Sequence, residues 1–113
     1  MKYKIVEHYN AVSIELKGNV MGGDDTKEFN ELLHKLLDEG KKNIVVDLSE
    51  VKFMNSSGLG MLIGGLTTMK KSDGFLKLAR TTEKIQSLLI ITKLITIFES
   101  YDSVDEAIKS FSN

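Results

Sequence analysis

The 113-residue chain has a formal net charge of -1 and contains neither cysteine nor proline. This charge balance gives no indication of a polyanionic partner, and the lack of cysteine excludes disulfides, thiol chemistry and cysteine-based metal sites. No stretch approaches the ~20 apolar residues of a transmembrane helix, and the first residues lack the apolar core of a signal peptide. We therefore expect one cytoplasmic domain over residues 1–113, with no membrane contact.

The N-terminal part of the sequence predicts a hairpin followed by a helix. Tyr3–Tyr9 alternates loosely and residues 12–16 alternate cleanly between apolar and polar, which favours two antiparallel strands. A glycine-rich connection, residues 18–23, leads to a helix that a side chain at 24–26 could cap. Gly40 is the expected end of this helix. Its apolar stripe consists of Phe29, Leu32, Leu33, Leu36 and Leu37.

A strand and a glycine-rich helix form the centre of the chain. Residues 43–48 are an apolar, β-branched run that is typical of a buried strand. Beyond them, apolar residues recur at the spacing of one helical stripe. These residues are Leu59, Leu62, Ile63, Leu66 and Met69. The segment Asn55–Gly60 therefore lies where the strand has ended and the helix begins, and helix N-termini favour oxygen atoms and negative charge.

The C-terminal part continues the alternation of strands and helices. A turn at 72–74 precedes a strand over Phe75–Ala79, and a helix is expected over about Thr82–Ile91. A short strand over Thr96–Glu99 follows, and Ser103 can cap a final helix. The resulting order, β-β-α-β-α-β-α-β-α, predicts an α/β fold with a mixed sheet, in which an N-terminal hairpin joins parallel strands and about four helices pack on the sheet.

The face of the central helix that lies opposite its apolar stripe is uncharged until Lys70. It contains Ser57, Gly60, Met61, Gly64, Gly65 and Thr68. A solvent-facing surface would normally carry charged residues, and each glycine weakens a helix by about 1 kcal/mol relative to alanine. Close approach by a partner protein explains the glycines, and so does tight packing within the fold.

The sequence offers little for catalysis. A serine between a strand and a helix is typical of the hydrolase motif G-x-S-x-G, but the leading glycine is missing before Ser56. The only candidates for a base are His8 and His34, and His34 is expected to be solvated. No lysine follows the glycines as a Walker loop requires. We therefore expect neither an enzyme nor a bound cofactor.

Metal binding is not expected either. The suggestive carboxylates are those of the pair Asp24-Asp25 and of Asp47. We interpret the pair as a helix cap and Asp47 as a residue at a strand end or turn.

With catalysis and metal binding set aside, a serine that is itself modified remains as a hypothesis. A phosphate on Ser56 would add about -1.5 to -2 charges and three acceptor oxygens beside an uncharged surface. A partner closing on that surface would have to desolvate the dianion, which is unfavourable unless the charge is paired. The residues alone favour the simpler interpretation, that Ser56 or Ser57 is only the N-cap of the helix.

Residues 47–60, D-L-S-E-V-K-F-M-N-S-S-G-L-G, resemble the signature of the STAS domain, especially that of bacterial anti-sigma factor antagonists. In that family a strand ends in D-L-S-x-V-x-F/Y-M-D, and S-[ST]-G-L-G opens a helix. The resemblance covers the whole chain, because the remaining strands and helices fall in the family order. It implies the STAS fold.

The resemblance also implies a mechanism called partner switching. The unphosphorylated antagonist binds an anti-sigma factor, which is also a serine kinase, and so frees a sigma factor. The kinase phosphorylates the first serine of the motif, which separates the two proteins, and a serine phosphatase resets the system. Such a regulator needs no direct contact with nucleic acid, and we expect it to be a monomer or a weak homodimer.

Carried over to this chain, the resemblance implies that Ser56 is the phosphorylated residue. The docking surface that we expect combines the motif with the outer face of the helix and consists of Asn55, Ser57, Gly58, Gly60, Met61, Gly64 and Met21. The family usually has aspartate at the position of Asn55 and often has one near Met21. The alternative function is a STAS scaffold or ligand-sensing module that is never phosphorylated.

Overall fold

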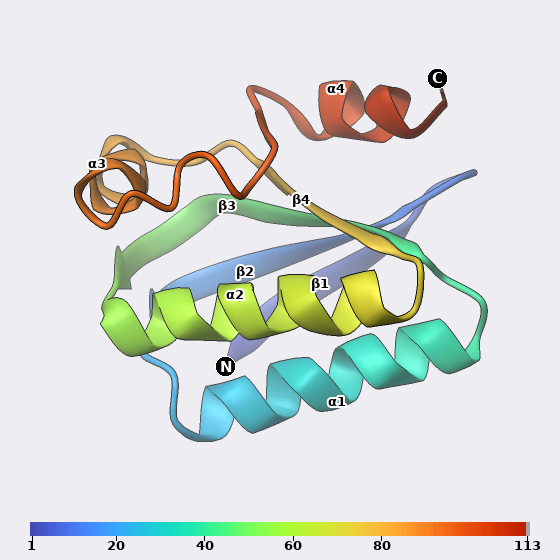
Figure 1. Ribbon diagram of the computed structural model, residues 1–113, viewed down its shortest axis with the longest axis horizontal. Helices are drawn as coiled ribbons and strands as arrows, with labels where there is room; N and C mark the ends of the chain where they lie inside the picture. Colours follow the sequence, from blue (N-terminus) through green and yellow to red (C-terminus); the bar gives the residue numbers. More distant parts are fainter. Residues whose placement is uncertain (113) are drawn as a thin grey trace.

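The computed structural model describes residues 1–112 and shows a five-stranded sheet with helices on both faces (Figure 1). The elements are β1 (Lys2–Glu7), β2 (Val12–Val20), α1 (Asp24–Asp38), β3 (Asn43–Met54), α2 (Ser56–Lys71), β4 (Phe75–Ala79), α3 (Glu83–Ile91), β5 (Ser100–Tyr101), α4 (Val104–Lys109) and a short 3-10 helix, Ser110–Ser112. The predicted fold class and element order are confirmed. The expected domain end at Asn113 lies outside the described residues.

The sheet has the strand order β1-β2-β3-β4-β5. β1 runs antiparallel to β2, whereas the pairs β2–β3, β3–β4 and β4–β5 are parallel, so the sheet is mixed as predicted. Helices α1 and α2 cover one face and α3 and α4 lie on the other (Figure 1). The main core lies under α1 and α2, and a small cluster of Val45, Ala79 and Ala107 lies under α4.

Strands β2 and β3 are both longer than the sequence predicted. The expected connection over residues 18–23 is partly strand, because Gly18 pairs with Val51 and Val20 pairs with Met54. Register shifts interrupt this pairing on either side of Gly18, whose φ of 77° suits a bulge. The extension carries β3 directly to the start of α2.

Helix α1 begins without the predicted side-chain cap. Its N-cap is Gly23, and the N–H groups of Asp25 and Thr26 donate to the carbonyl oxygens of Gly22 and Gly23 at 3.2 and 3.0 Å. The end at Gly40 is confirmed. With φ at 79°, Gly40 donates its N–H to the carbonyl oxygen of Leu37 at 2.9 Å.

The C-terminal third contains one wrong prediction. Strand β4 and helix α3 lie where expected, but Thr96–Glu99 forms a turn, and β5 is only Ser100–Tyr101. After α3 the chain folds back, since the N–H groups of Leu94 and Ile95 both donate to the carbonyl oxygen of Leu89. Among residues 1–112, every helix is too short or too polar to cross a lipid bilayer.

Candidate functional site

The junction between β3 and α2 is capped by Asn55. This residue has an extended backbone, and its Oδ1 accepts the N–H of Gly58 at 2.8 Å. Asn55 therefore satisfies one of the free N–H groups in the first turn of α2. The alternative prediction, that Ser56 or Ser57 is the N-cap, is wrong.

Ser56 is the first residue of α2, and its side chain is exposed. The expectation of an accessible serine at this helix N-terminus is confirmed. Because Asn55 supplies the cap, the Ser56 hydroxyl is not needed as a hydrogen-bond acceptor for the first turn of α2. The first turn contains no acidic residue, so the positive end of the helix dipole is not already compensated there. A phosphate on Ser56 would lie beside N–H groups that have no partner within the helix.

Two glycines hold the end of β2 and its following loop against the first turn of α2. A Cβ on Gly58 would collide with the carbonyl oxygen of Val20, and a Cβ on Gly22 would lie 2.6 Å from the Cβ of Ser57. Gly58 and Gly22 thus serve packing within the fold. The close contact brings Met21, which is 45% exposed, to the same end of the molecule as the two serines.

The outer face of α2 is only partly exposed, which corrects the prediction. Met61 is 2% exposed and Gly65 is buried, and a Cβ on Gly65 would lie 2.6 Å from the ring of Phe29. Helix α1 packs beside α2 and covers this side, so the expected outward direction of both residues was wrong. Gly60 and Gly64 do face open space, since a Cβ added to either would meet no atom within 4 Å.

A shallow groove of about 400 Å³ remains between α1 and α2. We call it the α1–α2 groove; the residues lining it include Thr26, Phe29, Asn30, Met61, Gly64 and Thr68. Thr68 donates its hydroxyl to Oδ1 of Asn30 at 3.0 Å across the two helices. The groove combines apolar side chains with glycine backbone. One of its two walls is α2, the helix that begins with Ser56.

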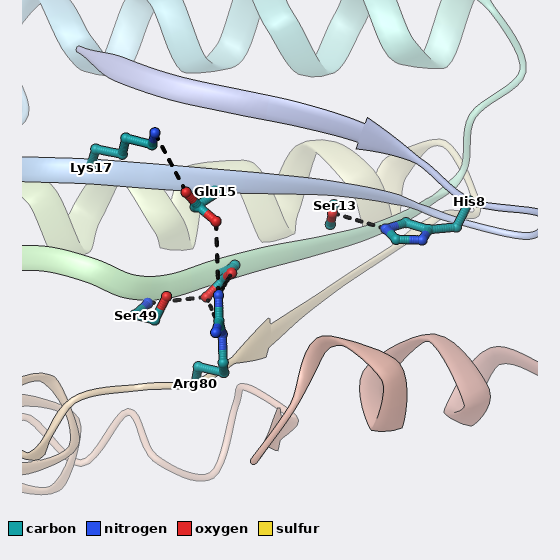
Figure 2. A network of polar contacts seen from close by, with 7 residues as sticks. His8, Ser13, Glu15, Lys17, Ser49 and Arg80 are labelled. Carbon is teal, nitrogen blue, oxygen red and sulfur yellow. Dashed lines mark hydrogen bonds and ion pairs between the residues drawn. The ribbon is translucent and has the colours of Figure 1, made fainter.

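A polar network occupies the opposite face of the sheet (Figure 2). Asp47, which is buried within β3, accepts hydrogen bonds from Nε of Arg80 at 3.1 Å and from the N–H of Ser49 at 3.1 Å. A second guanidinium nitrogen of Arg80 lies 3.8 Å from Glu15, toward which Arg80 points in Figure 2. Asp47 is thus an ion-paired residue inside a strand, and its expected position at a strand end was wrong.

The network controls the ionisation of both partners. Burial opposes the charged form of Asp47, but the hydrogen bonds from Arg80 and Ser49 outweigh it and lower the pKa of this carboxyl below its ordinary value. The same hydrogen bond raises the pKa of Arg80. Sequence reasoning missed Arg80, whose φ of 54° places it in the left-handed region just after β4. The pairing with Asp47 indicates a structural role.

In the part of the chain that the structure describes, neither histidine forms a hydrogen bond with Ser56. His8 hydrogen-bonds Ser13 at 3.0 Å, at the opposite end of β2 from the serine pair (Figure 2). His34 is exposed on α1. Within residues 1–112, no group of three or more metal-ligating side chains lies close enough together to hold an ion.

Comparison with known proteins identifies the family. Residues 2–107 match the STAS domain. The chain belongs to the STAS domain family. It is 30% identical over 109 residues to a candidate anti-sigma factor antagonist of Thermotoga maritima. The aligned region covers 95% of this chain and 93% of that protein.

Solved STAS structures agree with this fold. A candidate anti-sigma factor antagonist from Thermotoga maritima superposes with a TM-score of 0.83 at 26% identity, covering 99% of this chain and 94% of that one. The Bacillus cell fate determinant SpoIIAA in its phosphorylated form superposes with a TM-score of 0.74 at 17% identity, covering 97% of this chain and 99% of that one. This second similarity concerns the fold alone.

Proposed function

We propose that this STAS protein is an anti-sigma factor antagonist that binds a kinase-type anti-sigma factor through the start of α2 and is released by phosphorylation of Ser56. The observation that carries the proposal is that Asn55, and not Ser56, caps the N-terminus of α2. Asn55 accepts the N–H of Gly58 at 2.8 Å, and Ser56 stays exposed and is not needed to cap the helix. The protein would act in the cytoplasm as a regulator, not as an enzyme.

Phosphorylation would change this surface in two opposite ways. Within the free protein, the N–H groups of the first turn and the helix dipole would stabilise the added negative charge. Against a bound partner, the same dianion would be desolvated and, if unpaired, would cost several kcal/mol. The helix tolerates the modification and the complex does not, which is the property that a switch requires.

The docking surface would consist of the exposed members of the predicted set. Met21, Ser57 and Gly60 lie around the first turns of α2 and Gly64 lies one turn further along the helix. Together they expose an apolar side chain, a hydroxyl and bare backbone. Glycine allows close approach of a partner's backbone, and methionine adapts its shape to an apolar contact. Asn55, Gly58 and Met61 would support this surface from below, through capping and packing.

The relatives support the proposal at the level of the family. The Thermotoga maritima protein, which is similar to this chain in both sequence and structure, carries the name of anti-sigma factor antagonist. Asn55 is compatible with this function, because its amide oxygen caps the helix as an aspartate carboxylate would, although without the charge.

The proposal is tested by incubating the protein with ATP and a kinase-type anti-sigma factor encoded in the same genome. Mass spectrometry should find one phosphate on wild type and on Ser57→Ala, and none on Ser56→Ala. Ser57 is the matched control, since it is also a serine, also exposed and one residue away. A phosphate found only on Ser57 would refute the assignment. Absence of both labelling and binding would favour the unphosphorylated STAS scaffold.

A further inference from the structure

The outer edge of the sheet is formed by β1, and all six of its residues are exposed. Among residues 1–112, β1 pairs only with β2. The N–H of His8 donates to the carbonyl oxygen of Ala11 at 2.8 Å and closes the hairpin. Hydrogen-bonded and non-bonded pairs alternate along an antiparallel ladder, so Lys2, Lys4 and Val6 point their backbone groups toward β2. The N–H and C=O groups of the intervening residues therefore point outward.

These intervening residues are Tyr3, Ile5 and Glu7. Tyr3 and Ile5 lie opposite the buried residues Leu16 and Ile14, on the face of the sheet that α1 and α2 cover. They remain 36% and 38% exposed because β1 is the edge strand. An edge that combines free backbone groups with exposed apolar side chains is a template for pairing with another strand.

We propose that β1 pairs antiparallel with β1 of a second copy of this chain, centred on Ile5. In a continuous sheet, residues directly opposite one another share a face. With Ile5 facing Ile5 of the second copy, Tyr3 faces Glu7, and each pair exchanges two N–H···O bonds. All outward backbone groups of Tyr3, Ile5 and Glu7 are then satisfied, and the two copies contribute the same surface, as a two-fold dimer requires.

Charge and the length of β1 distinguish this register from the two registers shifted by one residue. Centring the pair on Lys4 would place Lys4 directly opposite Lys4 of the second copy, and like charges in that position are destabilising. Centring it on Val6 would bring Tyr3 opposite Tyr9, which lies in the turn beyond the strand. The register centred on Ile5 instead places Lys4 opposite Val6 and no like charges face one another.

The dimer leaves the candidate site open. Ser56 follows β3, which is separated from β1 by β2, and the partner strand adds on the far side of β1. The assembly therefore presents two α2 N-termini, each with its own Ser56. A strand-only interface is small, so the expected dissociation constant lies in the range of ~0.01–1 mM.

Sedimentation equilibrium of wild type, Ile5→Lys and Ile91→Lys tests the proposal. Ile5→Lys places two lysines opposite each other at the two-fold axis and should weaken dimerisation about tenfold or more. Ile91→Lys is the matched control, because Ile91 is a 78% exposed isoleucine on α3, away from β1. A wild type that stays monomeric up to ~1 mM would overturn the proposal. So would a dimer that Ile91→Lys disrupts and Ile5→Lys does not.

Amide hydrogen exchange of the wild type gives a second test that needs no variant. The amides of Lys4 and Val6 should be protected at every protein concentration, because they belong to the β1–β2 ladder. Those of Tyr3, Ile5 and Glu7 should become protected only at concentrations where the dimer forms. Protection that does not alternate along β1, or does not depend on concentration, would contradict the strand pairing.

Discussion

The amide oxygen of Asn55 lies 2.8 Å from the N–H nitrogen of Gly58, and this hydrogen bond determines where α2 begins. Gly58 in turn packs its bare Cα against the carbonyl oxygen of Val20 at the end of β2. A strand end, a cap and a loop are thereby fixed around one exposed residue, Ser56. The chemistry proposed for Ser56 depends on this arrangement, which gives the first prediction.

Removing the cap should destabilise the protein without changing its fold. We expect Asn55→Ala to lower the free energy of unfolding by about 1 kcal/mol, because the N–H of Gly58 loses its acceptor. Asn55→Asp keeps an acceptor and adds a charge that the helix N-terminus favours, so its stability should equal or exceed that of wild type. Urea unfolding measures both variants. Equal stability of Asn55→Ala and wild type would contradict the assigned cap.

The ion pair between Asp47 and Arg80 should make stability depend on pH in the acid range. The folded state lowers the pKa of Asp47 below the ordinary 3.8, so the ionised carboxylate stabilises the fold above about pH 4. That stabilisation is lost as the pH falls through the pKa of the folded state. Asp47→Asn should therefore cost about 1–3 kcal/mol at pH 7, and the difference from wild type should shrink below about pH 4.

Glu15→Gln is the control for this experiment. Its carboxylate also approaches Arg80, but at 3.8 Å and with more solvent around it than Asp47. The expected change at pH 7 is below about 0.5 kcal/mol. A difference between Asp47→Asn and wild type that stays constant from pH 7 down to pH 2 would show that the charge of Asp47 contributes nothing.

Local patterns were sufficient to predict most of the elements. The alternation at residues 12–16 predicts that one face of a strand is buried, and the stripe beginning at Leu59 predicts that one face of a helix is buried. In the structure both faces are buried between the sheet and its helices. The extension of β2 and β3 was missed because their paired ends contain a bulge at Gly18, which breaks the period of two. Residues 96–99 resemble a strand, but they form a turn from which Phe98 packs into the core at 5% exposure, whereas Ile97 is 42% exposed.

The candidate site was predicted less completely, for a different physical reason. A helical projection of α2 shows which side its apolar stripe faces, but it contains no information about a second helix packed alongside. The projection therefore predicted that Met61 and Gly65 face solvent, but in the structure both are buried on the side of α2 that α1 covers. Arg80 could not be foreseen, because its contact with Asp47 joins residues 33 positions apart. Ser56 could, since the strand-to-helix junction is local.

A negative charge that mimics phosphate at Ser56 should weaken binding to the proposed anti-sigma factor. We expect Ser56→Asp to weaken binding to the anti-sigma factor and Ser56→Ala to keep it, because only the former adds charge to the docking surface. The aspartate effect should be smaller than that of phosphate, since one carboxylate carries less charge. Isothermal titration calorimetry compares the affinities. Equal affinities for Ser56→Ala and phosphorylated wild type would contradict a phosphate switch.

Two adjacent glycines on α2 should respond in opposite ways to substitution. A side chain on Gly64 meets open space, so Gly64→Lys should leave stability unchanged or raise it by up to ~1 kcal/mol, as replacing an exposed helical glycine does. The lysine should nonetheless abolish partner binding, because it stands in the α1–α2 groove. Gly65→Ala makes the smaller change but pushes against Phe29, and it should cost about 1–3 kcal/mol. Thermal unfolding and a binding assay on both variants distinguish a binding surface from a packing surface. If Gly64→Lys unfolds the protein, the exposed face of α2 serves packing, and the docking surface must lie elsewhere, on the connection that contains Met21.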